Sequence, residues 1–417
     1  MAMSRRYPGI HRMSLLLRPV VMVDDADIVQ EVLTERMLEF ERLDLIYSFS
    51  QPFFGHGLVR ALNREFRPQR KMIQPAFNHS RVAAYAETMT SCAEQAPRKW
   101  QDGATLNIAD ELTRITMGII GKAMFDSDLL GEMDVLGNAI TTAVTGTSGA
   151  LPIPLGVPTP RNLKVKAAIK RLNATIYRLI RERRAEGIDH GDLLSMLIAS
   201  KGESGEGMSD EQIRDELITI FLAGHETTAL ALTWSLYLLG RHPAEYAKVR
   251  QEVDTALQGR TPQLNDLVKL PYTLQVIKEA MRLYPPAHVI SRVTVEATKL
   301  GGYELPKHQV VMLDIYAMHH RNAYFPQPMH FNPDRFSVEH EKLLPKGAYL
   351  PFSTGPRVCI GSQFAMLETQ LVLATLIQRI DFELVPGQKV RPAGLVTLRP
   401  NGPVKMQVKR RIMEGTQ

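Results

Sequence analysis

Residues 351–361 read PFSTGPRVCIG and contain Cys359, one of only two cysteines in a chain of 417 residues. The run that starts at this cysteine, CIGSQFAMLETQLVLATLIQRI, is amphipathic with helical spacing, so Cys359 lies at or just before a helix N-terminus. The helix dipole and the first backbone N–H groups stabilise a thiolate there. Gly355 and Gly361 let the backbone approach a flat partner closely, and Arg357 supplies a positive charge for an anionic group.

Three interpretations of Cys359 remain open on these residues alone. The thiol could be a buried structural group, a nucleophile that needs a histidine and an orienting partner, or a metal-ligating thiolate. A closed zinc site is disfavoured because neither CxxC nor HxxxH occurs. His319, His320 and His330 lie near one another in the sequence, but adjacent histidines point in different directions, which favours ordinary surface or loop histidines.

Composition indicates a globular intracellular protein. Hydrophobic residues make up 44% and charged residues 23% of the chain, which are ordinary values. Two cysteines cannot form a disulfide framework, which favours a reducing compartment and a cytoplasmic location. The apolar runs near the N-terminus are short, so neither a signal peptide nor a membrane anchor is expected. The net charge of +6 favours acidic partners, but the basic residues are dispersed, so no nucleic acid is expected.

Helical patterns dominate the chain, and strand-like pieces are few. Apolar residues recur at three- and four-residue spacing in DADIVQEVLTERML, YAETMTSCAEQAPRKW, NLKVKAAIKRLNATIYRLIRERRAEG and AEYAKVRQEVDTALQG. Strand patterns occur in SLLLRPVVMV, GGYELP, QVVMLDIYAM, LVTLRP and VKMQV. No linker or repeat divides the sequence. We therefore expect a mainly α protein with small β-sheets, built as one domain over residues 1–417.

The strongest predicted helix runs from Ser209 to Gly240. Ser209 and Gln212 form a capping box at its start, and Gly240 is the expected C′ residue. The helix is apolar on nearly all sides, so it should be buried. Its middle reads AGHETT, residues 223–228, and polar exceptions of this kind are expected at functional sites.

Four motifs together resemble those of the cytochrome P450 haem-thiolate monooxygenases of the soluble bacterial type. FSTGPRVCIG matches the family's cysteine signature, and AGHETT resembles its oxygen-binding helix. EAMR, residues 279–282, and FNPDRF, residues 331–336, resemble the segments of its Glu-Arg-Arg network. The motifs follow in family order, and the likeness covers residues 20–408. It implies the P450 fold, with a long central helix over the haem, and we expect the family's first helix to be missing at the N-terminus.

The resemblance implies haem b (iron protoporphyrin IX) as the cofactor, with Cys359 as the axial ligand of the iron. Phe352 would pack beside the haem, Gly361 would let the loop pack closely, and Gly224 would leave room for oxygen. The predicted partners of the haem propionates are Arg357, Arg70 and Arg292. One departure concerns Phe66, which stands where the family usually has Trp or His and cannot donate a hydrogen bond to a propionate.

The same resemblance assigns the remaining site residues. Glu226 and Thr227 match the acid–alcohol pair that delivers protons to bound dioxygen. Glu279, Arg282 and Arg335 would form a structural network that holds the cysteine loop. The predicted substrate pocket contains Phe49, Phe53, Ala223, Val289, Ile290 and Val396. Its apolar character implies an apolar, medium-sized substrate, either a terpenoid or a fatty-acyl chain.

The expected activity is insertion of one oxygen atom from O2 into that substrate. No Walker-type or dinucleotide-binding glycine loop occurs, so electrons should come from a separate ferredoxin or flavodoxin and an NAD(P)H-dependent reductase. Three rival functions are a non-catalytic haem protein that binds a gas or ligand, a haem-thiolate isomerase or dehydratase, and a helical scaffold without cofactor. The Glu226–Thr227 pair favours oxygen-dependent chemistry.

Overall fold

The computed structural model describes residues 6–15, 18–43, 55–125, 157–202, 205–394 and 396–411. The chain forms two compact units. Unit 1 contains residues 1–41, 89–115 and 227–417, and unit 2 contains residues 42–88 and 116–226. The helices α6, α7 and α11 cross from one unit to the other. The expectation of a single domain stays a prediction.

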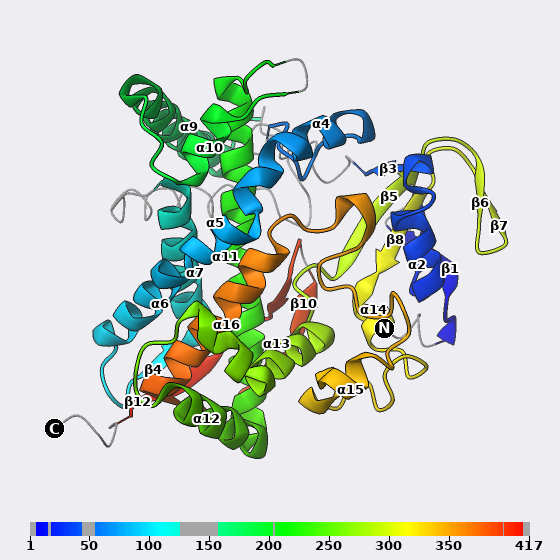
Figure 1. Cartoon of the computed structure of the whole chain (residues 1–417). Coiled ribbons are helices and arrows are strands. Elements are labelled where there is room, and N and C mark those ends of the chain that lie inside the picture. Colours follow the sequence, from blue (N-terminus) through cyan, green and yellow to red (C-terminus); the bar gives the residue numbers. More distant parts are fainter. Residues whose placement is uncertain are drawn as a thin grey trace. The chain divides into compact units, whose positions relative to one another are not determined.

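The main sheet of unit 1 has five strands in the order β1-β2-β8-β5-β3 (Figure 1). Strands β1 and β2 form an antiparallel hairpin, β2 runs parallel to β8, and β8 runs antiparallel to β5. The strand bounds are β1 Ile10–Leu15, β2 Arg18–Val23, β8 Val310–Asp314, β5 Val289–Thr294 and β3 Phe40–Arg42. Strands β2, β5 and β8 are rich in valine and isoleucine, whose β-branched side chains pack well on a pleated surface.

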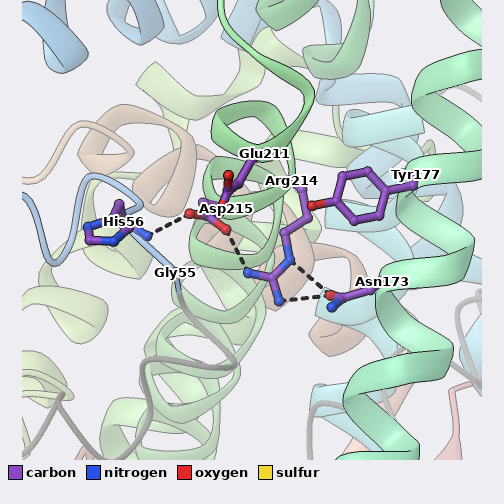
Figure 2. Close-up of a pocket in the computed structure, with 7 residues that line it drawn as sticks. All are labelled: Gly55, His56, Asn173, Tyr177, Glu211, Arg214 and Asp215. Carbon is purple, nitrogen blue, oxygen red and sulfur yellow. Dashed lines mark hydrogen bonds and ion pairs between the residues drawn. The ribbon is translucent and has the colours of Figure 1, made fainter.

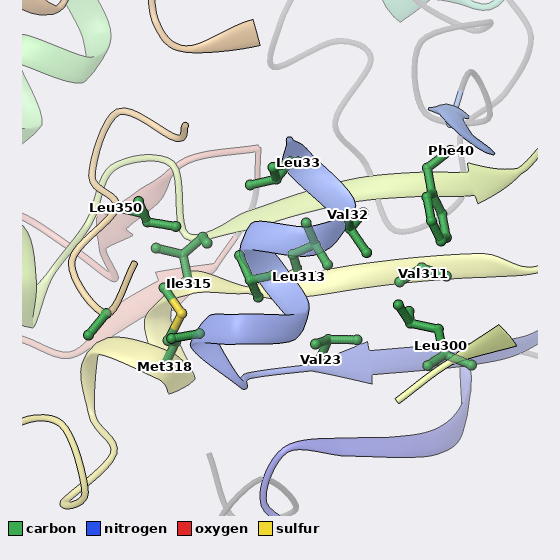
Figure 3. Close-up of a cluster of buried hydrophobic side chains, with 14 of the residues drawn as sticks. Val23, Val32, Leu33, Phe40, Leu300, Val311, Leu313, Ile315, Met318 and Leu350 are labelled. Atoms are coloured by element: carbon green, nitrogen blue, oxygen red, sulfur yellow. The ribbon is translucent and has the colours of Figure 1, made fainter. Parts of the chain in front are cut away.

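Helix α2, Ala26–Leu33, packs on this sheet and forms its hydrophobic core (Figure 3). Asp25 begins the helix by accepting hydrogen bonds from the N–H groups of Asp27 and Ile28. Val32 and Leu33 belong to the same core cluster as Val311 and Leu313 of β8. Leu350, which precedes the cysteine loop, belongs to the same cluster. The residue that leads into the cysteine loop is therefore part of the hydrophobic core of the sheet.

Three smaller sheets complete the β structure of the described residues. One has the order β4-β12-β9, and β6–β7 and β10–β11 are two-stranded. Their bounds are β4 Thr105–Asn107, β12 Lys405–Arg410, β9 Ile380–Leu384, β6 Thr298–Leu300, β7 Tyr303–Leu305, β10 Pro392–Gly394 and β11 Leu398–Pro400. The predicted strands GGYELP, LVTLRP and VKMQV correspond to β7, β11 and β12.

Helices supply most of the remaining described structure. Unit 1 contains α12 Pro243–Leu257, α13 Pro271–Leu283, α14 Ile315–His319, α15 Val338–Glu341 and α16 Ser362–Arg379. Unit 2 contains α4 Asn63–Ile73, α5 His79–Ala84, α9 Pro160–Glu186 and α10 Leu193–Ala199. The helices that cross between the units are α6 Ala86–Gln95, α7 Ile108–Phe125 and α11 Asp210–Arg241. All four helical patterns quoted from the sequence therefore form helices.

Helix α11 confirms the predicted N-terminus and corrects the predicted C-terminus. The Ser209 amide donates to Gln212 Oε1 at 2.9 Å, and the Gln212 amide donates to Ser209 Oγ at 3.1 Å, which is the capping box. Gly240 lies inside the helix, so its assignment as the C′ residue is wrong. A Cβ atom at Gly240 would meet Leu384 Cβ at 3.0 Å and Met406 Cε at 3.1 Å. The glycine therefore allows close packing against β9 and β12 and does not end the helix.

The segment QVVMLDIYAM is only half strand, which corrects a second prediction. Strand β8 ends at Asp314, and helix α14 begins at Ile315. The Asp314 side chain accepts a hydrogen bond from the Ala317 amide at 2.9 Å and so caps the new helix. Capping explains why a run of β-prone residues changes to helix at this point.

Among the described helices, only α11 is long and apolar enough to cross a membrane. Within the protein, 72% of its apolar window is buried, which is what a core helix shows as well.

Candidate functional site

The cysteine loop lies in unit 1 between Leu350 and the start of α16. Cys359 precedes this helix by three residues, which confirms its predicted place ahead of a helix N-terminus. Its amide donates to the Phe352 carbonyl at 3.0 Å and closes the loop. Its side chain is exposed, so the thiol is accessible to a ligand. Gly361 is the N-cap residue of α16.

Gly355 is required by the packing of this loop. Its φ of +73° lies in the left-handed region that favours glycine. A Cβ atom at Gly355 would lie 2.2 Å from the Leu33 carbonyl oxygen at the end of α2. The loop can therefore rest on α2 only with glycine at this position.

Arg357 is almost fully buried, with 5% of its side chain exposed. Its Nη2 lies 3.9 Å from Glu41 Oε1, the outer limit of an ion pair. Glu41 was not singled out from the sequence because it lies far from Arg357 along the chain. A buried guanidinium in this loop places a positive charge where an anionic group would be stabilised.

Glu279, Arg282 and Arg335 come together in unit 1 as the motifs predict. Arg282 and Glu279 are fully buried and form two hydrogen bonds, at 2.7 Å (Nε to Oε2) and 2.8 Å (Nη2 to Oε1). Arg335 Nε lies 3.5 Å from Glu279 Oε1. Arg282 also donates to the carbonyls of His319 and Pro328. One charged cluster thus ties α13 to the segments that precede the cysteine loop.

The AGHETT segment occupies the middle of α11. Ala223 is exposed although the flanking turns of the helix are buried. A Cβ atom at Gly224 would meet Ile120 Cδ1 of α7 at 3.0 Å, so this glycine also permits close helix packing. Thr116 of α7 donates to the His225 carbonyl at 2.9 Å. Glu226 and Thr227 follow as neighbours and are both partly exposed.

Two further arginines predicted for cofactor binding occupy different units. Arg70 lies in the last turn of α4, with its guanidinium carbon 5.8 Å from the centre of the Phe66 ring. Phe66 is buried and supports Arg70 by a cation–π contact where the family usually has a hydrogen-bond donor. Arg292 of β5 is 3% exposed, and its Nη1 donates to the Ser291 carbonyl at 2.9 Å.

The family model of cytochrome P450 matches residues 1–408 of this chain. The chain is 36% identical to cyclooctatin synthase of Streptomyces melanosporofaciens, over 93% of this chain and 86% of that protein. It is 31% identical to pentalenene oxygenase of Streptomyces avermitilis, over 89% of this chain and 84% of that protein. The solved haem domain of cytochrome P450DA matches with a TM-score of 0.90 and 28% identity, over 100% of this chain and 93% of that one.

The chain therefore belongs to the cytochrome P450 family and has its fold. The predictions of an oxygen-dependent oxidoreductase and of haem b as the cofactor are confirmed at the level of the family. The described residues fit such a group: an accessible thiol stands before a helix N-terminus, on a loop that rests on α2 through a glycine. The buried Arg357 in the same loop suits an anionic substituent.

The predicted substrate-pocket residues are only partly described. Val289 and Ile290 are partly exposed on β5, and Val396 is 55% exposed. Phe49 and Phe53 lie outside the described residues.

One pocket of unit 2, with a volume of about 370 Å³, has a polar lining (Figure 2). Arg214 at its centre bonds Asp215 Oδ1 at 2.6 Å and Asn173 Oδ1 at 2.7 Å. Tyr177, Glu211, His56 and Gly55 complete the lining. None of the predicted pocket residues that the structure describes belongs to this lining, and the charged lining does not suit an apolar substrate.

Two buried titratable groups near the site were not predicted. Burial raises the pKa of the Glu368 carboxyl on α16 well above its usual value, and the Thr228 hydroxyl opposes that shift. Burial, His320 and Arg282 lower the pKa of His319 well below its usual value. No sequence signal distinguishes Glu368 from the other polar residues of its helix, whereas His319 belongs to a noticeable histidine cluster.

Proposed function

We propose that this protein is a monooxygenase that inserts one oxygen atom from O2 into an apolar, medium-sized terpenoid. The observation that carries the proposal is the accessible Cys359 thiol on its glycine-supported loop in a P450 fold. Two relatives at 36% identity, cyclooctatin synthase and cyclooctat-9-en-7-ol 5-monooxygenase, bear the names of cyclic terpenoids and favour a terpenoid, whereas leukotriene-B4 omega-hydroxylase 3, named for a fatty-acyl substrate, is 31% identical. Electrons would come from a separate ferredoxin or flavodoxin and an NAD(P)H-dependent reductase.

Each site residue has a proposed task. Haem, when bound, supplies the activation of dioxygen. Cys359 would hold the iron through its sulfur, Phe352 would pack beside the haem, and Arg357, Arg292 and Arg70 would pair with its propionates. Thr227 positions a proton donor on the distal side, and Glu226 carries protons toward it from water. Glu279, Arg282 and Arg335 act only through the loop that they hold.

The ligand assignment is tested by comparing Cys359→Ser with Cys92→Ser. Cys92 is partly buried and lies on α6, so its variant is a matched control for the loss of a thiol. We expect the reduced carbonyl complex of Cys92→Ser to keep a red-shifted Soret band and that of Cys359→Ser to lose it. A red-shifted band in Cys359→Ser would refute the assignment.

The proton-delivery role is tested by Thr227→Ala against Thr233→Ala. The Thr233 hydroxyl already donates to the Ala229 carbonyl at 2.6 Å within α11, so its loss should leave catalysis intact. We expect Thr227→Ala to divert NAD(P)H into hydrogen peroxide, with less product per NAD(P)H. Equal product yields in the two variants would contradict the role.

The substrate class is tested by titrating the purified protein with a cyclic terpene alcohol and with a fatty acid of equal carbon number. We expect the terpene to shift the haem spin state at lower concentration. Label incorporated from oxygen gas into the product then separates a monooxygenase from an isomerase or a dehydratase.

A further inference from the structure

His319 is a fully buried histidine that the proposed reaction does not use. It is the last residue of α14, with 0% of its surface exposed. Its ring lies 5.3 Å from the Tyr349 ring and 6.3 Å from the Phe325 ring, measured between centroids. A buried imidazole needs hydrogen-bond partners.

Two hydrogen bonds connect His319 to Arg282 on one hand and to Leu350, at the start of the cysteine loop, on the other. Its backbone carbonyl accepts from Arg282 Nη1 at 2.9 Å, which links it to the Glu279–Arg282 pair. Its ring Nε2 accepts from the Leu350 amide at 2.9 Å, across 31 positions of the chain. A backbone amide can only donate, so Nε2 carries no proton and the ring is the neutral Nδ1–H tautomer. The lowered pKa of His319 agrees with a neutral ring.

Leu350 is the first residue of the stem that leads into the cysteine loop. Its side chain is held in the sheet core beside Ile315 and Met318 (Figure 3). Its carbonyl accepts from the Ser353 amide at 3.2 Å, and the Phe352 carbonyl accepts from the Cys359 amide at 3.0 Å. The stem is therefore joined to the cysteine by a short series of backbone hydrogen bonds.

The turn after Leu350 needs support from outside the loop. Pro351 has no amide hydrogen to contribute, and Ser353 adopts a φ of +64° that non-glycine residues rarely adopt. Such a conformation persists only where surrounding contacts hold it. The bond from the Leu350 amide to His319 is a contact of that kind.

We propose that His319 is a positioning residue that fixes the stem of the cysteine loop and so keeps Cys359 in the geometry of a thiolate ligand. The inference rests on the proposed ligand role of Cys359 for its spectroscopic consequence, but not for its effect on the loop. Without the Nε2 acceptor the Leu350 amide is buried and unpaired, and the loop must rearrange to satisfy it. The Phe352 carbonyl then no longer holds the Cys359 amide in place, and the sulfur is displaced from the position of a ligand.

The test compares His319→Leu, His319→Gln and His320→Leu in the full-length protein as purified. Leucine removes the acceptor and keeps an apolar side chain, whereas a glutamine amide oxygen can reach the former position of Nε2. His320 is the matched control, because it is the buried neighbour whose Nδ1 bonds the Tyr316 carbonyl within the same turn. Amide hydrogen exchange is measured in peptides that cover residues 350–359, and the carbonyl spectrum is recorded in parallel.

We expect His319→Leu to speed exchange in these peptides by about tenfold, the effect of one lost buried hydrogen bond. A large fraction of its carbonyl complex should lose the red-shifted band, while His319→Gln and His320→Leu stay close to the wild type. Equal exchange in His319→Leu and His320→Leu would overturn the proposal. If exchange changes but the carbonyl band does not, His319 holds the loop without positioning Cys359 and the proposal is overturned, while the ligand role of Cys359 is decided separately by the Cys359→Ser variant.

If His319→Leu does not fold, the pair His319→Gln and His319→Asn decides the matter. Asparagine is too short to reach the Leu350 amide from the same backbone position. Protection restored only by glutamine supports the proposal, and equal protection in both variants refutes it.

Discussion

Glu279 and Glu216 are both fully buried, yet their surroundings differ completely. Glu279, on α13 of unit 1, has two arginine side chains within 3.5 Å, and Arg282 is as buried as the glutamate. Glu216, on α11 of unit 2, accepts a hydrogen bond from the Leu58 amide at 3.0 Å, and no described cation pairs with it. Burial raises the pKa of Glu216 to about 8, with the Leu58 amide opposing the shift and Asp215 adding to it.

The difference shows two ways in which one protein anchors a loop by a buried carboxyl group. Beside the cysteine loop the Glu279 carboxyl group is paired with buried arginine, so the anchor is strong and needs both partners. In the segment 55–58 of unit 2, the Asp215 carboxylate accepts a hydrogen bond from the His56 amide at 2.6 Å, and Glu216, as a neutral acid, accepts one from the Leu58 amide. The first anchor is sensitive to mutation, and the second is sensitive to pH.

The largest expected effect is that of breaking the charged anchor with Arg282→Ala. Glu279 would be left as a buried carboxylate without its main partner, and such a loss costs about 3–5 kcal/mol. We expect little folded, haem-containing protein. Lys278→Ala is the control, because Lys278 lies on the same helix and its ion pair with Glu341 is partly exposed. Denaturant unfolding should show a loss of at most about 1 kcal/mol for this control. Equal losses in the two variants would contradict the argument.

The two glutamates can be compared directly as Glu279→Gln and Glu216→Gln. The first change removes the charge that neutralises Arg282 and should lower the free energy of unfolding by about 3 kcal/mol. The second keeps an acceptor for the Leu58 amide and removes no paired charge, so at pH 7 the stability should change by less than about 1 kcal/mol. Denaturant unfolding of both variants at pH 7 gives the ranking. The reverse ranking would show that the two anchors were assigned wrongly.

The sequence could predict the parts of the site that depend on local spacing. Glu279 and Arg282 lie three positions apart on one helix, so their meeting follows from helical geometry. The capping box at Ser209 and the place of Cys359 before a helix are local patterns of the same kind.

The contacts that hold the cysteine loop depend on tertiary packing, and the sequence does not show them. The bond between His319 and the Leu350 amide spans 31 positions and a proline-containing turn. Gly240 illustrates the same limit: the residue type suits a helix end, but here it lies inside the helix, where it allows the neighbouring sheet to pack closely. Spacing along the chain carries no information about which distant segment packs against a given residue.

Gly355→Ala tests the backbone side of the cysteine-loop anchor. A methyl group there would lie 2.2 Å from the Leu33 carbonyl oxygen, and the φ of +73° is unfavourable for alanine. We expect a loss of about 2 kcal/mol or more in the free energy of unfolding, together with a weaker red-shifted carbonyl band. Gly387→Ala is the matched control, because its φ is +76° but a Cβ atom there would meet nothing within 4 Å. We expect Gly387→Ala to lower the free energy of unfolding by about 1 kcal/mol, which measures the backbone strain without the clash. Identical losses in the two variants would mean that the contact with Leu33 contributes nothing.

The smallest expected effect, measured per pH unit, is the change in the free energy of unfolding that the buried Glu216 causes as the pH rises. Because its pKa is raised from 4.5 to about 8 in the folded protein, the folded state keeps a proton that the unfolded chain releases. Its contribution to stability is complete below about pH 4.5 and is lost as the pH rises through about 8. Linkage sets the steepest slope at about 1.4 kcal/mol per pH unit.

Glu216→Gln should flatten the curve of unfolding free energy against pH between pH 5 and pH 8, whereas Glu211→Gln, an exposed change on the same helix, should preserve it. Parallel curves for the wild type and Glu216→Gln would mean that Glu216 is ionised in the folded state, and the contrast with Glu279 would then disappear.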